Sequence, residues 1–457
     1  MEQIAISTDD LVAALLNIAA SETVCILDSC GVNHLGSHLL IAGIEPVSVK
    51  EISENESENT LAFLDEAFSR KDVASIFTLS YDFGRKLLHI APERPKTDEP
   101  DVFLAQFDVL IIHDYDTGET KIIGNAKKSK AIESKLISNI GVFKSEISNF
   151  KSEIKNESID VRSNFTLDEY LSAIEIIKEH IRDGDTYQTN LTQQLSAKLP
   201  DGLTPEIIFH RLRRDHPAPF AAFIKRLDST VVSASPERFF RFDADSRKIS
   251  TSPIKGTRPR GETAAEDAVQ RQALLDSAKD RAENTMIVDL LRNDLGRICE
   301  YGSISVEKLC ELEEHPTLFH LVSTISGELR NDITFSDILK AVFPCGSITG
   351  APKISTMRII DEIEPSPRGL SMGAIGIYVP SPISKAQGQD QTLDIGHWTL
   401  DGRIDLSVAI RTMVIKDQIT AFNVGGGIVI DSDPESEYDE TLTKAKALIT
   451  ALRPSEK

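Results

Sequence analysis

The chain has 457 residues, a formal net charge of −21 at pH 7 and a hydrophobic content of 40%. This length can bury a large core and gives a soft expectation of about three domains. The acidic excess argues against non-specific binding to nucleic acid or to an anionic membrane, because lysine and arginine supply the affinity for such partners.

The N-terminal sequence and the cysteines favour the cytoplasm. No lysine or arginine precedes Lys50, so neither a secretory signal nor a transit peptide is expected. No apolar run approaches the ~18 residues of a membrane span. The five cysteines are odd in number and form no C-x-x-C pair, which favours free thiols in a reducing compartment.

Residues 1–142 alternate short apolar runs with polar breaks, which predicts strands mixed with short helices. We expect helices at 11–20 and 61–68, and strands at 24–27, 39–42, 76–79 and 109–112. Residues 143–156 then repeat Phe-Lys-Ser-Glu-Ile-x-Asn twice. Two heptads are too few for a coiled coil, so 143–164 is predicted to be a variable insertion or linker.

Residues 165–457 form the second large region. Thr166 and Glu169 make a capping box, and Gly184 is expected to end the helix that follows. Strands are predicted at 187–191, 220–224, 230–233, 239–242, 249–251, 374–379, 406–414 and 419–424. Helices are predicted at 264–292, 353–362 and 435–452. The mixture of hairpin-like strands and helices, without a regular βαβ repeat, favours an α+β fold.

Common short motifs for nucleotide binding and metalloprotease chemistry are missing from the sequence. Ser252 and Lys255 formally match S-x-x-K, but that motif needs its serine at the start of a helix, and Pro253 and Gly256 argue against one. The informative segments are longer. They are residues 252–261, 280–296, 346–353, 409–412, 425–429 and 437–441.

These segments, in this order, resemble the chorismate-utilising enzymes. That family includes anthranilate synthases, aminodeoxychorismate synthases, and isochorismate and salicylate synthases. The resemblance covers roughly residues 165–452 and is thin before residue 150. It implies an α+β fold of two large antiparallel β-sheets packed orthogonally and flanked by helices. It also implies chorismate as the substrate.

Glutamates on two helices are candidates for a metal site. Glu283 lies on the predicted long helix, and Glu437 and Glu440 are three residues apart on one face of the last helix. Mg²⁺ commonly binds one or two carboxylates and keeps its other positions for water and substrate. The resemblance assigns Mg²⁺ to Glu283 and Glu440, with Glu437 nearby.

Chorismate carries two carboxylates, so the site also needs donors for an anion. Arg411, at a predicted strand end, can bind a carboxylate through two parallel hydrogen bonds. Glycines in a tight turn let backbone N–H groups approach an anion closely. The resemblance implies substrate contacts at Gly256, Thr257, Thr349, Gly350, Arg411 and the turn Gly425, Gly426 and Gly427.

The resemblance also supplies the catalytic candidates. Glu237 matches a candidate general acid or base near the departing 4-hydroxyl group, and a carboxyl needs a raised pKa for that task at neutral pH. His320 matches a histidine thought to lie beside the ring.

Lys255 distinguishes the branches of the family. Anthranilate synthases usually carry alanine at this position, and aminodeoxychorismate synthases carry lysine. A neutral Lys255 amine can attack C2 and expel the C4 hydroxyl, after which ammonia attacks C4 and expels the lysine. Asn284 agrees with this branch. Gln188 stands where isochorismate-type enzymes place a lysine base, which disfavours water as the nucleophile.

We therefore expect the aminodeoxychorismate branch, with anthranilate synthesis as the alternative and a non-catalytic chorismate- or tryptophan-binding regulatory subunit as a more distant one. No cysteine occupies a G-x-C-x-G turn. Ammonia is therefore expected from a separate glutamine amidotransferase subunit. The Leu27-Asp28-Ser29 element, with Pro219, Phe220 and Ala221, resembles a tryptophan pocket, although Asp28 replaces the family's glutamate.

Overall fold

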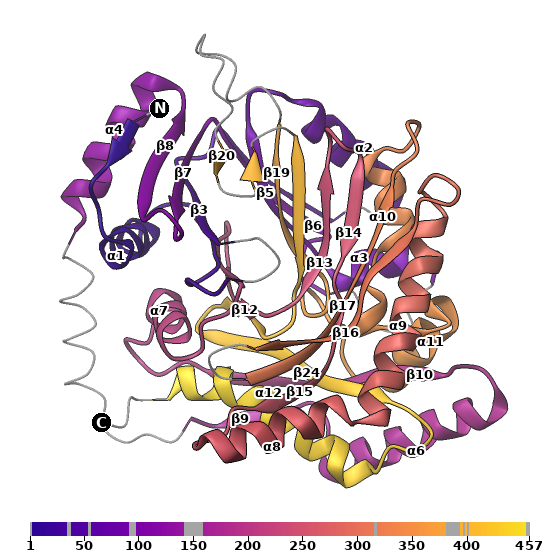
Figure 1. Cartoon of the computed structure of the whole chain (residues 1–457). Coiled ribbons are helices and arrows are strands. Elements are labelled where there is room, and N and C mark those ends of the chain that lie inside the picture. The colour runs from indigo at the N-terminus through magenta and orange to yellow at the C-terminus, as the bar shows by residue number, and fades with distance from the viewer. Residues whose placement is uncertain are drawn as a thin grey trace.

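The computed structural model describes residues 2–33, 38–53, 56–90, 97–140, 159–314, 318–380, 394–395, 398–399 and 402–453. The predicted heptad pair at 143–156 lies outside these residues. All pairs of strands in the described part of the chain are antiparallel, and two large sheets contain nearly all of them (Figure 1). The α+β class with two antiparallel sheets and flanking helices is confirmed.

The larger sheet has 12 strands in the order β1-β8-β7-β3-β2-β11-β12-β23-β24-β10-β18, with β9 also paired to β10. Its strands are β1 (Glu2–Ile4), β2 (Val24–Asp28), β3 (Leu39–Ile44), β7 (Val109–Asp114), β8 (Glu119–Gly124), β9 (Val161–Ser163), β10 (Gln188–Lys198), β11 (Phe220–Lys225), β12 (Thr230–Ser235), β18 (Gly350–Ala351), β23 (Thr412–Lys416) and β24 (Ile419–Ile428).

The second sheet has 10 strands in the order β15-β17-β14-β13-β22-β19-β5-β6-β4, with β16 on β17. Its strands are β4 (Ser48–Ile52), β5 (Ala74–Leu79), β6 (Val102–Phe107), β13 (Arg238–Asp243), β14 (Lys248–Thr251), β15 (Ile254–Pro259), β16 (Ser305–Glu314), β17 (Leu318–Glu328), β19 (Ala374–Val379) and β22 (Arg403–Val408). A separate pair, β20 (Asp394–Ile395) and β21 (Trp398–Thr399), completes the described strands.

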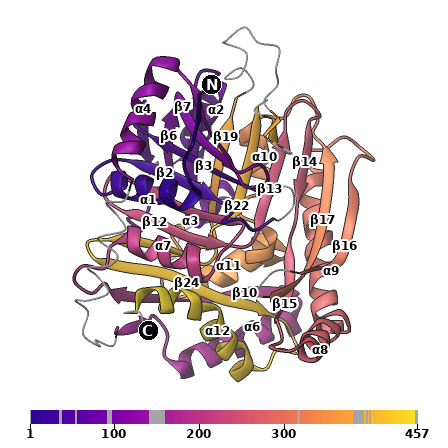
Figure 2. The ribbon, with the colours of Figure 1, turned by 60° about the vertical axis from the view of Figure 1, so that its left-hand side comes forward.

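The sheets face each other across an apolar layer. Cys25 and Ile41 of the larger sheet and Ile76 and Phe103 of the second sheet belong to this layer, whereas the alternate residues of the same strands face outward. In Figures 1 and 2, β24 and β10 run across the lower part of the molecule, and β13, β14 and β19 stand upright. The two sets of strands therefore cross.

Helices cover the outer faces of both sheets. The larger sheet carries α1 (Thr8–Ala19), α4 (Ala126–Ser138), α6 (Leu167–Asp183), α7 (Pro205–Asp215) and α12 (Pro434–Leu452). The second sheet carries α2 (Ser57–Ser69), α3 (Tyr81–Leu87), α8 (Ala264–Leu275), α9 (Ala278–Gly296) and α10 (Phe335–Val342). Helix α11 (Lys353–Ile363) packs against β10 and β18 of the larger sheet and adds Met357 to the core of the second sheet. A short 3₁₀ turn, η1 (Gly346–Ile348), precedes β18. No described helix is long and apolar enough to cross a membrane.

Several predicted elements are confirmed and two are wrong. The capping box at Thr166 and Glu169 is present, and Gly184 ends α6 with φ +85°. The single helix predicted at 264–292 is two helices, because Ser277 accepts a hydrogen bond from Asp280 N and starts α9 anew.

The strand predicted at 406–414 is also two strands. It breaks at Arg411, whose φ is +49° and therefore lies outside the extended region.

This second break carries the chain from one sheet to the other. β22 belongs to the second sheet and β23 to the larger one, and Arg411 lies in the crossing. A neighbouring crossing runs the opposite way from β12 to β13 and contains Glu237. The two crossings are bonded together, because Val408 N donates to Glu237 O at 3.0 Å and Ala234 N to Arg411 O at 3.0 Å. The fold thus brings two candidate site residues together.

Candidate active site

Glu237 and Lys255 converge on the short turn η1. The Ser347 hydroxyl donates to Glu237 Oε1 at 2.7 Å, and Lys255 Nζ donates to the Ser347 carbonyl oxygen at 3.3 Å. Glu237 is buried, and burial raises the pKa of its carboxyl, although the Ser347 hydrogen bond and the Lys255 cation oppose this. A buried carboxyl with a raised pKa is suited to act as a general acid.

Sequence reasoning did not single out Ser347, although it lies within the motif at 346–353. The structure makes it the one described residue that hydrogen-bonds both Glu237 and Lys255. Thr349 is held in the same turn, since its hydroxyl donates to the Cys345 carbonyl oxygen at 3.1 Å. Gly350 has φ +145°, and a Cβ there would overlap the Gln188 carbonyl oxygen. Glycine is therefore needed at 350 for the close pairing of β18 with β10.

The three glutamates predicted to bind metal lie on α9 and α12, around Lys279 and Lys444. Lys279 Nζ donates to Glu437 Oε1 at 3.2 Å, and Lys444 Nζ pairs with Glu440 Oε1 at 2.7 Å. Burial raises the pKa of Glu283, with Lys255 and Lys279 partly opposing it. For Glu440, burial also raises the pKa, but Lys444 and the other nearby lysines outweigh it and lower the pKa overall.

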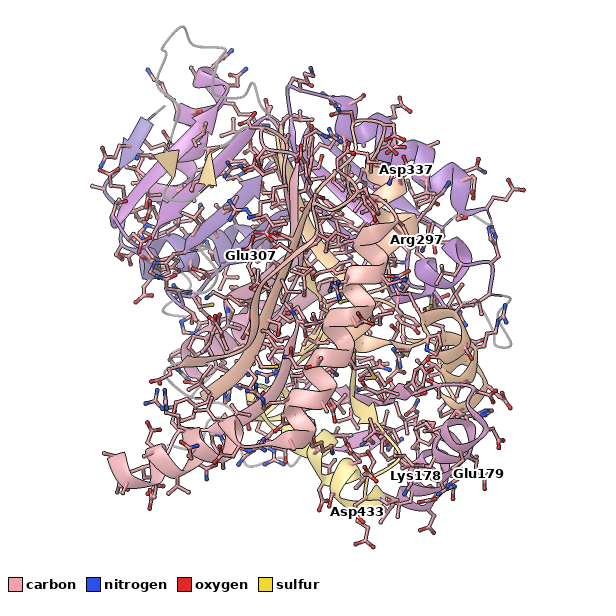
Figure 3. All side chains as sticks on the ribbon, turned by 45° about the vertical axis from the view of Figure 1, so that its right-hand side comes forward. Lys178, Glu179, Arg297, Glu307, Asp337 and Asp433 are labelled. Carbon is pink, nitrogen blue, oxygen red and sulfur yellow. The ribbon has the colours of Figure 1, made fainter. Side chains whose placement is uncertain are left out.

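The start of α12 places Glu437 and Glu440. Asp433 caps the helix by accepting from Ser436 N at 3.0 Å, and the Ser432 hydroxyl donates to Glu437 Oε1 at 2.7 Å. Lys178 of α6 donates to the Ser432 carbonyl oxygen at 3.0 Å, and Figure 3 shows Lys178 beside Asp433 at this end of the helix. Two helices and their caps therefore fix the direction of the carboxylates.

The donor set fits a divalent cation that uses few protein ligands. A Cβ built on Gly426 of β24 would lie 3.3 Å from Glu437 Oε2 and 3.9 Å from Glu440 Oε1. The same point lies 3.8 Å from Lys444 Nζ, so Gly426 faces both carboxylates and the lysine that pairs with Glu440. Among the described residues, no three His, Cys, Asp or Glu side chains lie close enough to hold a metal unaided. Mg²⁺ accepts one or two protein carboxylates beside water and substrate oxygens, and its binding at these glutamates stays a prediction.

The glycines at 425–427 do not form the predicted turn. They lie within β24, where Gly425, Gly426 and Gly427 pair with Thr192, Leu191 and Asn190 of β10. This ladder uses one edge of β24, because the pairing with β23 on the other edge ends at Ala421. The glycines are therefore extended rather than in a turn, and their contact with a substrate anion stays a prediction. Gly427 instead leaves room for the Gln188 side chain, whose Oε1 is buried without a hydrogen-bond partner in the described part of the chain.

Arg411 and His320 line a second part of the site. They share a cavity of about 90 Å³ with mainly apolar walls that include Pro236, the neighbour of Glu237. His320 Nδ1 is 2.9 Å from the Thr257 hydroxyl on β15, two residues from Lys255. Burial lowers the pKa of Arg411, and no carboxylate of the described residues pairs with its guanidinium. A partly buried arginine that faces a cavity and has no carboxylate partner among the described residues is suited to an anionic ligand.

Gly256 and Asn284 lie in tightly packed positions beside the site. Gly256 has φ +82°, and a Cβ there would lie 2.9 Å from side-chain atoms of both Leu274 and Asp280. Asn284 is fully buried, where it donates to the Leu321 carbonyl oxygen at 3.2 Å and accepts from the Ser323 hydroxyl. These residues hold α8, α9 and β17 around Lys255 and Glu283.

The predicted tryptophan-pocket residues also come together. Ser29, Pro219, Phe220 and Ala221 line a cavity of about 50 Å³ between the sheets. Ser29 Oγ is buried there without a hydrogen-bond partner in the described part of the chain. The neighbouring Asp28 already accepts from Tyr115 Oη at 2.7 Å and Arg213 Nε at 2.8 Å. Pro219 is shared with the cavity of Arg411, so the two cavities adjoin.

These features agree with the comparisons to known proteins. The family model described as chorismate binding enzyme matches residues 25–381 and 394–450. The chain therefore belongs to the chorismate-binding enzyme family.

Relatives within the family carry more than one name. The chain is 32% identical over 454 residues to aminodeoxychorismate synthase component 1 of Escherichia coli (strain K12), covering 95% of this chain and 89% of the relative. It is 41% identical over 296 residues to aminodeoxychorismate synthase of Streptomyces pristinaespiralis, covering 65% of this chain but only 38% of that relative. Anthranilate synthase component I from Streptococcus pneumoniae TIGR4 has a similar structure, with a TM-score of 0.73, 26% identity and coverage of 91% and 93%.

Proposed function

We propose that this protein is component I of an aminodeoxychorismate synthase, which converts chorismate and ammonia to 4-amino-4-deoxychorismate for 4-aminobenzoate and folate synthesis. The observation that carries the proposal is Lys255 Nζ beside Glu237, joined through Ser347. An amine at this point supplies the nucleophile that anthranilate synthesis does not need. The five cysteines, all free thiols, support a cytoplasmic setting.

Each residue has a distinct task in this proposal. The Lys255 amine attacks C2 of chorismate, the ring double bond shifts, and the C4 oxygen leaves as water with a proton from Glu237. Ammonia then attacks C4, the double bond shifts back, and the C2–nitrogen bond to Lys255 breaks. Arg411 receives a substrate carboxylate, and His320 and Thr257 line the wall near the ring.

Mg²⁺ completes the proposed site. Glu440 and Glu283, with Glu437, would hold the ion, which would supply positive charge for a second substrate carboxylate. Lys279 and Lys444 now neutralise Glu437 and Glu440, and they would balance the charge of the site before the ion and substrate bind. Ammonia would come from a separate glutamine amidotransferase, and free ammonium would substitute for it.

Anthranilate synthesis is the second candidate, because a structural relative of similar length carries that name. Product analysis separates the two. The purified protein is incubated with chorismate, Mg²⁺ and ammonium, and the mixture is resolved by chromatography with mass and fluorescence detection. The proposal expects 4-amino-4-deoxychorismate, which an added lyase converts to 4-aminobenzoate. Fluorescent anthranilate as the main product would contradict it.

A further inference from the structure

A buried ion pair beyond the C-terminal end of α11 lies next to the turn that holds Glu237 and Lys255. Arg368 and Glu364 are both 3% exposed. Arg368 Nη2 donates to Glu364 Oε1 at 2.7 Å, and Arg368 Nε donates to Glu364 Oε2 at 2.9 Å. Two parallel hydrogen bonds of this kind fix the plane of the guanidinium group.

The remaining donors of Arg368 connect two segments of the site. Arg368 Nη1 donates to the Ile348 carbonyl oxygen at 2.9 Å, and Nη2 also donates to the Asn190 carbonyl oxygen at 2.6 Å. Glu364 Oε1 in turn accepts from the backbone N–H of Thr192 at 2.7 Å. The pair therefore links the 3₁₀ turn η1 to strand β10, beside which α11 lies in Figure 1.

Ile348 lies between Ser347 and Thr349, so its carbonyl sets the position of both. Asn190 N donates to the Thr349 carbonyl oxygen at 2.8 Å, which closes a second link between β10 and this turn. Since Ser347 hydrogen-bonds Glu237 and Lys255, a displacement of Ile348 is passed on to both groups. A misplacement of about 1 Å can reduce a rate by about 10²-fold.

We propose that Arg368, with Glu364, is a positioning residue for the reaction: it holds the turn at 346–349 so that Ser347 keeps the Glu237 carboxyl beside the Lys255 amine. The inference rests on the proposed function only in taking Glu237 and Lys255 as the reacting groups. Arg368 itself acts through the backbone of Ile348 and Asn190 and needs no contact with substrate.

Arg368→Lys keeps the positive charge next to Glu364 but cannot reproduce the planar fork that reaches two carbonyl groups. We expect kcat for chorismate consumption to fall roughly 10- to 100-fold while KM changes less than about threefold. A second variant, Glu364→Gln with Arg368→Met, removes both charges, so no unpaired charge stays buried. It should show the same loss of kcat, and it replaces Arg368→Lys in the test if that variant does not fold.

Arg226→Lys is the matched control. Arg226 is also buried and pairs with Glu99 at 2.6 Å, but its other side-chain hydrogen bond goes to the Thr78 hydroxyl, outside the site. This variant should melt at a lower temperature than the wild type and keep its kcat. A purely structural Arg368 would behave in the same way.

A double-mutant cycle with Ser347→Ala gives the decisive readout. If Arg368 acts through Ser347, the loss of kcat in the double variant should be clearly smaller than the product of the two single losses. The inference would be overturned if the loss of kcat in the double variant equalled the product of the two single losses, or if folded Arg368 variants kept the wild-type kcat. Because chorismate consumption is measured, an anthranilate product would refute the proposed function and leave this test intact.

Discussion

At the scale of single residues, the site depends on small groups that hydrogen-bond the larger residues proposed to react. Ser347 is the clearest case, since its hydroxyl donates to Glu237 and its carbonyl oxygen accepts from Lys255. Sequence motifs identified the glutamate and the lysine as chemistry-bearing types. They did not identify the serine, because a hydroxyl that bonds a distant carboxyl leaves no periodic signal in a sequence.

Ser347→Ala should change the pH dependence in a predictable direction. Burial raises the pKa of Glu237, and the Ser347 hydrogen bond lowers it. An acid must be protonated to act, so kcat should fall as the pH rises through this pKa. Removing the hydroxyl raises the pKa further and should move the alkaline decline to higher pH.

The measurement is kcat against pH at saturating chorismate and a constant concentration of free ammonia. Ser366→Ala is a control that should leave the profile unchanged, since within the described part of the chain the Ser366 side chain accepts from Asn164 Nδ2 alone, at 3.2 Å. A decline that stays in place in Ser347→Ala, or moves to lower pH, would show that Glu237 is not the titrating acid.

At the scale of elements, the site is assembled by interruptions of regular structure. The break before α9 starts a new helix whose first turns present Lys279 and Glu283. The break at Arg411 moves the chain between the sheets. Hydrophobic periodicity predicted most of these segments but gave one continuous element across each break. The periodicity reports which face a residue occupies, and not where a cap or a positive φ ends an element.

The N-cap of α9 provides a test at this scale. Ser277→Ala removes the acceptor for Asp280 N and should lower the free energy of unfolding by about 1 kcal/mol. Because Glu283 lies in the second turn, the variant should also need more Mg²⁺ for half-maximal activity.

Thr204→Ala is the control, because it removes the equivalent cap of α7. The Thr204 hydroxyl accepts a hydrogen bond from Ile207 N at 3.4 Å. Thr204→Ala should cost about the same stability. If both variants changed the Mg²⁺ requirement equally, or Ser277→Ala did not change it, the cap of α9 would not position Glu283 for the proposed metal site.

At the scale of the whole molecule, both sheets combine strands from residues 2–124 with strands from residues 161–428. β2 pairs with β11 in the larger sheet, and β5 pairs with β19 in the second. The sequence indicated the α+β class and most of the strands in the second region. It could not indicate these pairings, because partners more than 190 residues apart leave no local pattern.

A fragment of residues 159–457 should therefore not fold as an independent unit. The fragment lacks β2 and β5, so the edges of β11 and β19 are exposed, together with half of the apolar layer between the sheets. Circular dichroism and size-exclusion chromatography should show loss of cooperative melting and aggregation. A monomeric fragment with cooperative melting and chorismate turnover would contradict this prediction.

The cavity between the sheets predicts a ligand effect on the whole molecule. A ligand bound only to the folded state stabilises it, by about 2.7 kcal/mol at 100 times Kd. L-Tryptophan should raise the melting temperature, and Ser29→Ala should reduce that rise by removing an unpaired buried hydroxyl.

Thr60→Ala, which removes another buried and unpaired hydroxyl outside the cavity, should leave the tryptophan effect unchanged. Wild-type protein whose melting temperature does not respond to millimolar L-tryptophan would show that the cavity has another role.

The product distribution of Lys255→Ala tests the central claim most directly. Wild type, Lys255→Ala and the surface control Lys248→Ala, whose amine pairs with Glu307 at 2.6 Å, are each incubated with chorismate, Mg²⁺ and ammonium. Wild type and Lys248→Ala should form 4-amino-4-deoxychorismate at equal rates. Lys255→Ala should lose most of that rate and shift its remaining product toward the 2-amino isomer. If Lys255→Ala forms the 4-amino product at the wild-type rate, Lys255 is not the nucleophile.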